Sequence, residues 1–136
     1  MTTKKIESCC IIDDDPIFIY GTKRLMKEID FCDNIIVYNN GQDALEGLVE
    51  MPESGEKVPP FIFLDLNMPI MNGWEFLDEF TQIPSNNLMK TVIYIISSSV
   101  DPRDLEKVKN YKEVNNYILK PITPKDLETV LNEAMV

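Results

Sequence analysis

The stretch Phe61-Ile62-Phe63-Leu64-Asp65-Leu66-Asn67 joins a continuous apolar run to an acidic residue. An apolar run of this length, without polar alternation, is typical of a strand that is buried on both faces of a parallel sheet. Asp65 follows at the position where such a strand would end. The stretch therefore predicts a parallel sheet with a polar side chain at the carboxyl end of one central strand.

Further apolar runs occur on both sides of this stretch, and segments with helical spacing separate them. The other runs are Cys9–Ile12, Ile35–Tyr38, Val92–Ile96 and Tyr117–Leu119. The apolar stripes of the expected helices are Phe18, Gly21, Leu25 and Ile29; Ala44, Leu45, Leu48 and Val49; Phe76, Leu77 and Phe80; Leu105 and Val108; and Leu127, Val130, Leu131 and Ala134. Regular alternation of strand and helix predicts an α/β fold, with a doubly wound five-stranded parallel sheet, right-handed crossovers and helices on both faces.

Boundary signals agree with this alternation. Asp15-Pro16 and Thr123-Pro124 each combine an N-cap residue with proline at the first helical position. The Pro-, Ser- and Asn-rich ranges Met51–Pro60 and Ile83–Lys90 predict surface loops. At 136 residues, we expect residues 1–136 to form one domain without an appended output domain.

Composition excludes several classes of function. Thirteen basic against 23 acidic residues give a net charge of −10, which opposes binding to nucleic-acid phosphates. The absence of histidine excludes a histidine-ligated zinc site, a Ser-His-Asp or Cys-His nucleophile and a phosphohistidine carrier. The cysteines Cys9, Cys10 and Cys32 predict buried free thiols in a reducing compartment. No apolar run is long enough for membrane insertion, so a cytoplasmic protein is expected.

Polar residues follow the apolar runs in a pattern that indicates a site. Asp13-Asp14-Asp15 follows the first run, Ser97-Ser98-Ser99 the fourth and Lys120-Pro121 the fifth, while Asp65 follows the third. Taken singly, each has an ordinary explanation: Asp15 as a helix cap, Ser97 as a strand-end serine, Lys120 as a solvated lysine. Because ligands of open parallel sheets bind outside the carboxyl ends of the strands, their joint placement favours a functional site.

The chemistry open to such a site is narrow. Crowded carboxylates without histidine suit a hard cation, Mg²⁺ or alternatively Mn²⁺. A carboxylate can also accept a phosphoryl group and form an aspartyl-phosphate, while a lysine and a hydroxyl neutralise the transferred charge. The five glycines are scattered singly, which excludes a Walker-type phosphate loop.

At this point the residues match a family: the chain resembles the receiver domain of two-component response regulators, in the single-domain form found among chemotaxis regulators. The motifs that carry the resemblance are Ile12-Asp13-Asp14-Asp15-Pro16, Leu64-Asp65-Leu66-Asn67-Met68-Pro69-Ile70-Met71-Asn72-Gly73, Ile96-Ser97-Ser98 and Tyr117-Ile118-Leu119-Lys120-Pro121. They follow one another in order and span nearly the whole chain. The resemblance implies the flavodoxin-like strand order 2-1-3-4-5, for which the family is itself a standard example.

The resemblance also implies a role for each residue of these motifs. Asp65 is expected to be the phosphoacceptor and Lys120 to pair with the phosphoryl oxygens, with a cis peptide bond between Lys120 and Pro121. Ser97 and Tyr117 are expected to form the switch, the serine binding the phosphoryl group and the aromatic ring reporting its movement. The expected metal ligands are Asp13, Asp14, Asp65 and the backbone carbonyl of Asn67.

The implied partners are a sensor histidine kinase or histidine phosphotransfer protein, which supplies the phosphohistidine, and an unnamed downstream protein. The downstream protein is expected at the face built from the fourth helix, fifth strand and fifth helix, which carries Arg103, Lys107, Lys109, Lys112 and Tyr117. Lysines on such a face are also commonly just solvated. A regulatory monomer or weak dimer, rather than an enzyme, is expected.

Two rival functions remain at the level of sequence. The first is a Mg²⁺-dependent phosphatase or phosphotransferase that works through an aspartyl-phosphate; such enzymes usually place a second Asp two residues after the nucleophile, where this chain has Asn67. The second is a degenerate receiver that serves only as an interaction module, which the full set of expected site residues disfavours. A Mg²⁺-dependent quench of Trp74 fluorescence would separate the second rival from a working receiver.

Overall fold

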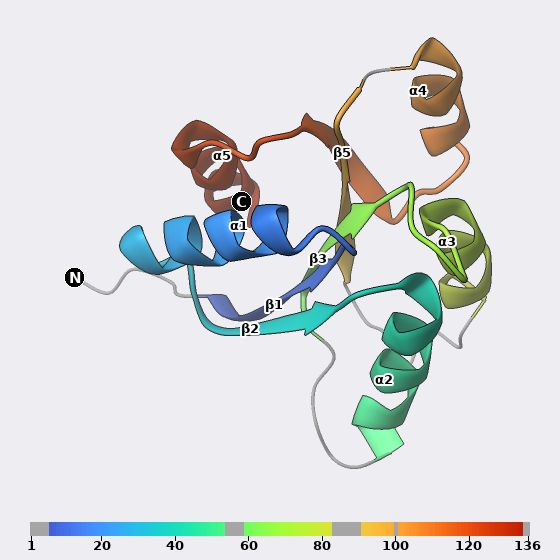
Figure 1. Cartoon of the computed structure of the whole chain (residues 1–136), viewed down its shortest axis with the longest axis horizontal. Helices are drawn as coiled ribbons and strands as arrows, with labels where there is room; N and C mark the ends of the chain where they lie inside the picture. Colours follow the sequence, from blue (N-terminus) through green and yellow to red (C-terminus); the bar gives the residue numbers. More distant parts are fainter. Residues whose placement is uncertain (1–5, 54–58, 83–90, 100, 135–136) are drawn as a thin grey trace.

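Strands and helices alternate along the whole described chain. The computed structural model describes residues 6–53, 59–82, 91–99 and 101–134 (Figure 1). The strands are β1 (Ile6–Ile12), β2 (Cys32–Tyr38), β3 (Phe61–Asp65), β4 (Val92–Ser97) and β5 (Val114–Leu119). The helices are α1 (Pro16–Glu28), α2 (Gly41–Glu53), α3 (Gly73–Phe80), α4 (Pro102–Val108) and α5 (Pro124–Ala134).

The strands form one parallel sheet in the order β2-β1-β3-β4-β5. This confirms the predicted fold class and strand order. β3 lies at the centre, where its residues Phe61–Asp65 are all buried. Parallel pairing brings the carboxyl ends of all the strands to one edge of the sheet, and β1 and β3 end side by side because Ile12 is in register with Leu64.

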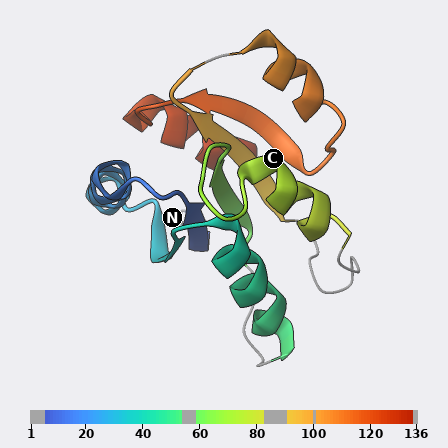
Figure 2. The same cartoon turned by 45° about the vertical axis from the view of Figure 1, so that its right-hand side comes forward.

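The helices cover both faces of the sheet, and each face has its own core. α1 and α5 lie on one side of the sheet (Figures 1 and 2). On this side Met26 and Leu127 belong to the same buried cluster as Phe63 and Tyr94 of the sheet. α2 and α3 lie on the other side, where Leu48 and Phe76 pack against the opposite faces of the same strands. The continuous apolar runs of the sequence are explained by this double burial.

The helix starts are fixed by side-chain caps. The Asp15 carboxylate accepts hydrogen bonds from the backbone N–H groups of Ile17 and Phe18, directly before Pro16 at the first helical position. At α5 the Thr123 hydroxyl accepts from the N–H of Asp126, whose carboxylate accepts from the N–H of Thr123 in return. Both predicted starts are confirmed.

The predicted buried stripe of α1 is wrong by one position. The buried residues of α1 are Ile19, Thr22 and Met26, whereas Phe18 is half-buried and Gly21 is exposed. Thr22 has a polar side chain, so a search for apolar spacing passes over it, although its methyl group suits a core.

Several element boundaries also differ from those expected. β1, β2 and β5 begin three residues before their apolar runs, because their first residues include polar side chains at the exposed end of the sheet. Met51 belongs to α2, so the predicted loop of residues 51–60 starts inside a helix. The predicted loop of residues 83–90 lies outside the described residues.

The described residues include the three cysteines and the helices that were searched for membrane spans. Cys9, Cys10 and Cys32 are free, and Cys9 and Cys10 are buried as predicted, whereas the prediction of burial is wrong for Cys32, which is only partly buried. Among the described helices, none has the length and apolar content needed to cross a bilayer.

Candidate functional site

Three carboxylates meet at the carboxyl edge of the sheet. Asp13 and Asp14 follow β1, and Asp65 is the last residue of β3. One oxygen from each of the three carboxylates lies within 4.8 Å of the others. Asp13 and Asp65 are buried, with exposed fractions of 0% and 5%, whereas Asp14 is exposed. The cluster thus has a closed inner wall and one side that faces solvent.

The three aspartates after β1 have two different structural roles. The N–H of Asp13 donates to the carbonyl of Tyr38, at 3.0 Å, which ties the end of β1 to the end of β2. The Asp13 carboxylate accepts from the N–H of Asp15, at 2.9 Å, and Asp15 in turn caps α1. Asp15 therefore acts as a helix cap, and the two preceding aspartates supply the carboxylates of the cluster.

The loop after β3 is tightly folded around Asp65. The N–H of Gly73 donates to the carbonyl of Leu66, at 2.9 Å. A Cβ atom at position 73 would lie 2.7 Å from the carbonyl oxygen of Asp65 and 2.8 Å from the Cα of Leu66, which explains why the motif ends in glycine. Asn72 and Glu75 form a capping box that begins α3. The start of α3 is thus hydrogen-bonded to the residue after Asp65, and this contact holds the backbone at the end of β3 in place.

Lys120 brings a positive charge into this acidic cluster. Its Nζ lies 2.8 Å from Oδ2 of Asp13 and 3.8 Å from Oδ1 of Asp65, and its side chain is only 16% exposed. The backbone N–H of Lys120 donates to the carbonyl of Ser97, at 2.8 Å, and the Lys120–Pro121 peptide bond is cis. In this structure the ammonium is paired chiefly with Asp13.

The electrostatics of the cluster act most strongly on Asp65. Burial, and after it the negative charge of Asp13, raise the pKa of its carboxyl from 3.8 to about 6, although Lys120 and the N–H of Asn67 oppose the shift. A carboxylate held in this way is poorly solvated and close to another acid, so a cation at the cluster would favour its ionised form.

Ser97 and Tyr117 lie near the end of β4 but are separately hydrogen-bonded. The Ser97 hydroxyl is buried at 2% exposure and accepts from the N–H of Ser99, at 3.3 Å. The Tyr117 hydroxyl donates to the carbonyl of Ser99, at 3.1 Å, and its ring is half-buried. Both side chains therefore contact the same short segment, which leads from β4 towards α4.

The donor set of the cluster fits a hard divalent cation. Three carboxylates within 4.8 Å of one another supply anionic oxygen ligands, the type that Mg²⁺ and Mn²⁺ prefer. Asn67 is exposed immediately after Asp65 and Leu66, so its carbonyl is a further candidate oxygen. A cation would also relieve the repulsion between Asp13 and Asp65.

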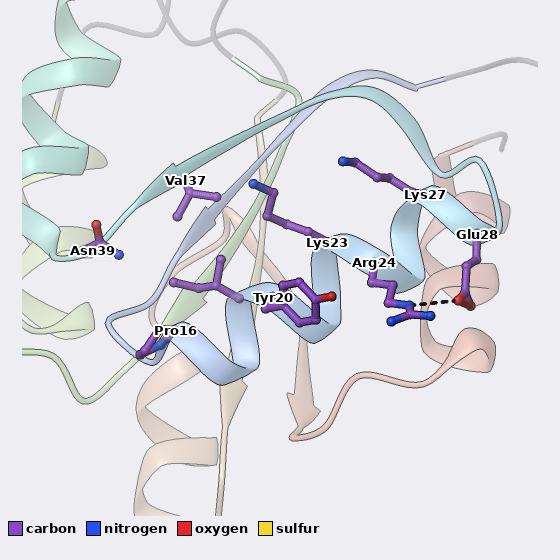
Figure 3. A pocket seen from close by; sticks show the side chains of 9 residues that line it. Pro16, Tyr20, Lys23, Arg24, Lys27, Glu28, Val37 and Asn39 are labelled. Carbon is purple, nitrogen blue, oxygen red and sulfur yellow. Dashed lines mark ion pairs between the residues drawn. The ribbon is translucent and has the colours of Figure 1, made fainter.

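A separate groove runs beside the cluster, between α1 and β2. It has a volume of about 860 Å³ and is lined by apolar and basic side chains that include Tyr20, Lys23, Lys27 and Val37 (Figure 3). None of its lining residues belongs to the carboxylate cluster. Asn39, which lines the groove, connects the two, since its amide donates to the backbone carbonyl of Asp13, at 3.5 Å. The carboxylate cluster is thus a separate site at the edge of the sheet and does not open into this groove.

The predicted site residues include the three carboxylates of the cluster and omit two residues that lie next to it. Asn39, which follows β2, is not among the predicted site residues, although its amide contacts the backbone of Asp13. Phe18 belongs to the predicted buried stripe of the first helix, but its ring lies over the ammonium of Lys120. An aromatic residue at helical spacing gives no sign in the sequence that its ring faces a charged group.

Comparison with known proteins gives one consistent result. The model of the response regulator receiver domain family matches residues 9–132. The nitrate/nitrite response regulator protein NarL of Escherichia coli K12 is 30% identical over 98% of this chain, and the chain spans 57% of that protein's length.

Solved structures agree with the sequence match. A two-component response regulator from Cytophaga hutchinsonii superposes with a TM-score of 0.88 at 32% identity, over 97% of this chain and 98% of that one. The chemotaxis protein CheY4 of Vibrio cholerae has the same fold, with a TM-score of 0.75 at 18% identity over 94% of this chain and 98% of that one.

Proposed function

The chain belongs to the response regulator receiver domain family, and from that premise we propose that it is a phosphorylation switch in which Asp65 accepts a phosphoryl group. The donor is a phosphohistidine of a sensor histidine kinase or histidine phosphotransfer protein, since this chain has no histidine of its own. The observation that carries the proposal is the position of the Asp65 carboxylate, buried within the carboxylate cluster and 3.8 Å from Lys120.

In the proposed reaction an Asp65 carboxylate oxygen attacks the phosphorus of the phosphohistidine. The new P–O bond forms as the P–N bond breaks, and the electron pair of that bond stays with the partner's imidazole. A divalent cation held by Asp13, Asp14, Asp65 and the Asn67 carbonyl would supply charge neutralisation for the phosphoryl oxygens when bound. Because the carboxylate is itself the nucleophile, the transfer needs no general base.

Lys120 and Ser97 act on the product in this proposal. The ammonium of Lys120 is already within the cluster, so a small movement from Asp13 towards Asp65 would pair it with a phosphoryl oxygen. The Ser97 hydroxyl accepts from the N–H of Ser99 and keeps its own O–H donor, which could be directed to another of these oxygens if Ser97 moves towards the site.

The switch would pass from the site to the surface through the Ser97–Ser99 segment. Tyr117 holds the carbonyl of Ser99, so movement of Ser97 changes the contact that fixes the tyrosine ring. The result would bias a two-state equilibrium of the face formed by α4, β5 and α5, where the proposed downstream protein binds.

The decisive experiment is phosphorylation by a small-molecule phosphodonor such as phosphoramidate, followed by intact-protein mass spectrometry. The wild-type chain is expected to gain one phosphoryl group when Mg²⁺ is present and none when EDTA is added. Asp65→Asn should gain none, while the matched control Asp104→Asn, on α4, should behave as wild type. Phosphorylation of Asp65→Asn to the wild-type level would show that Asp65 is not the acceptor.

A further inference from the structure

The aromatic ring of Phe18 faces the ammonium of Lys120. Nζ lies 4.4 Å from the centroid of the ring, a distance typical of a cation–π contact. Phe18 comes from α1 and Lys120 from the end of β5, so segments far apart in the sequence form this contact. The lysine side chain is 16% exposed and the phenylalanine is half-buried. The ring therefore covers part of the ammonium at a place where water would otherwise reach it.

The main chain of Phe18 is held by the same acidic run that supplies the carboxylates. Its N–H donates to the carboxylate of Asp15, at 3.4 Å, and the N–H of Asp15 donates to the carboxylate of Asp13, at 2.9 Å. These two bonds tie the backbone of Phe18 to the acidic run, while the position of its ring also depends on how α1 lies against the end of β5.

The core of α1 does not explain why position 18 is aromatic. The side chains that α1 buries fully are Ile19, Thr22 and Met26, on a neighbouring face of the helix. Phe18 lies at the margin of the core on that side of the sheet, where it is only partly buried. An aliphatic side chain could fill this margin, but it would lack the negative ring face that attracts a cation.

An aromatic ring is also well suited to hold a lysine whose N–H donors must remain available for other groups. An ammonium has three N–H donors and no acceptor. A carboxylate or amide at position 18 would occupy one of these donors, whereas the face of a ring attracts the charge without accepting a conventional hydrogen bond. All three donors then remain available for Asp13, Asp65 and an incoming phosphoryl oxygen.

We propose that Phe18 is a positioning residue for Lys120, whose ring keeps the ammonium between Asp13 and Asp65 during phosphoryl transfer. This inference rests on the proposed function. It assigns a role in the reaction to a residue outside the motifs that carry the family resemblance. The aromatic character of the side chain, and not its bulk, is the property that matters.

The test compares the initial rates at which phosphoramidate phosphorylates matched variants at saturating Mg²⁺. Phe18→Leu is expected to react roughly 3- to 10-fold more slowly than wild type, because the cation–π attraction is lost. Phe18→Tyr should restore the rate to within about 2-fold, since it keeps the ring face. Leu25→Met, which changes another partly buried position of α1, should react as wild type. Melting temperatures measured in parallel separate a slower reaction from a smaller folded fraction.

A double-mutant cycle with Lys120→Met then identifies the residue through which Phe18 acts. In the Lys120→Met background, Phe18→Leu is expected to have no further effect on the rate. An equal slowing by Phe18→Leu with and without Lys120 would overturn the inference, as would a wild-type rate for Phe18→Leu. If the wild-type chain takes up no phosphoryl group, the proposed function fails and this inference with it; the other two results overturn the inference alone.

Discussion

α4 and α5 lie on either side of β5 in the chain, yet they are attached to the sheet in very different ways. α5 buries Leu127 and Val130, with exposed fractions of 0% and 1%. α4, which the structure describes from Pro102 to Val108, has no buried residue, and its Leu105 is 39% exposed. One helix is therefore part of the core, and the other rests on the surface.

The polar contacts of the two helices differ in the same way. On α5, the Glu133 carboxylate accepts from the hydroxyl of Tyr94, at 2.7 Å, and from the amide of Asn115, at 2.9 Å. These bonds tie α5 to two strands. On α4, Lys107 lies over the ring of Trp74, with Nζ 4.5 Å from the centroid, a contact made at the surface.

The difference indicates which helix can respond to the site. An element with few buried apolar contacts opens locally at a low free-energy cost, whereas an element of the core opens only with the whole fold. α4 also follows the segment after β4 that Ser97 and Tyr117 contact. We therefore expect α4 to move on phosphorylation and α5 to remain in place as a fixed reference.

The strongest test of this contrast removes one leucine from each helix. Leu127→Ala is expected to lower the free energy of unfolding by about 2–4 kcal/mol, because it leaves a cavity in the core. Leu105→Ala should cost less than about 1 kcal/mol, because the side chain is already partly in water. Urea denaturation of both variants measures the difference, and equal costs would contradict the contrast.

The charge of Asp65 gives a second test, with a defined pH dependence. In the metal-free protein the pKa of Asp65 is raised from 3.8 to about 6, so the folded state holds this proton more tightly than the unfolded state. The contribution of Asp65 to the stability of the wild type is therefore lost as the pH rises from about 4 to about 6. Asp65→Asn should be more stable than wild type by roughly 1–2 kcal/mol above this range, allowing for solvent screening, and should show no gain below it.

Amide hydrogen exchange can show how the stability gained by Asp65→Asn is distributed between α4 and α5. In Asp65→Asn at pH 7, the amides of α5 should exchange more slowly than in wild type, because they open with global unfolding. The amides of α4 should be unchanged, because they exchange through local opening. Equal slowing in both helices would show that α4 is as firmly attached as α5.

The hydroxyl groups of two tyrosines give a smaller contrast. Tyr94→Phe removes the donor to Glu133 and leaves the amide of Asn115 with one fewer acceptor, at an expected cost of about 1–2 kcal/mol. Tyr111 follows α4, and its hydroxyl donates an exposed hydrogen bond to Asp78. Tyr111→Phe removes this bond and should cost less than about 0.5 kcal/mol. Thermal unfolding of both variants, monitored by circular dichroism, measures these costs.

The smallest effect is expected at the contact between Lys107 and Trp74. Lys107→Gln should destabilise the protein by about 0.5 kcal/mol or less, because the lysine is exposed and its contact is solvated. The emission spectrum of Trp74 should nevertheless shift, since the cation next to the ring is lost. A cost above about 1 kcal/mol would mean that α4 is anchored more firmly than its burial indicates.

The sequence was most informative where residue type alone decides the structure. The continuous apolar runs predicted the central strands, and the aspartates and the lysine that follow them do meet at one edge of the sheet. The spacing was less informative where burial and polarity do not coincide. Thr22 is buried in α1 despite its hydroxyl, and β5 begins with residues that include the exposed, polar Asn115 and Asn116.

The contacts that tune the site could not be predicted in the same way. The aromatic character of Phe18 is visible in the sequence, but the direction of its ring depends on where α1 crosses the end of β5. Similarly, the weak stripe of α4 predicted a helix but not that none of its side chains would be fully buried. Such features depend on the distances between helices and strands, and the apolar periodicity of one segment gives no information about those distances.

The ion pair between Lys120 and Asp13 has a consequence for how tightly the cluster can bind a metal. The lysine occupies, as an internal counter-ion, a carboxylate that an external cation would need. Metal affinity at such a site is a competition between a tethered charge and a diffusible one, and not a property of the number of ligands alone. The same tether partly neutralises the acids of the folded chain, so that a bound metal would compete with the ammonium for Asp13 and would leave it freer to pair beside Asp65.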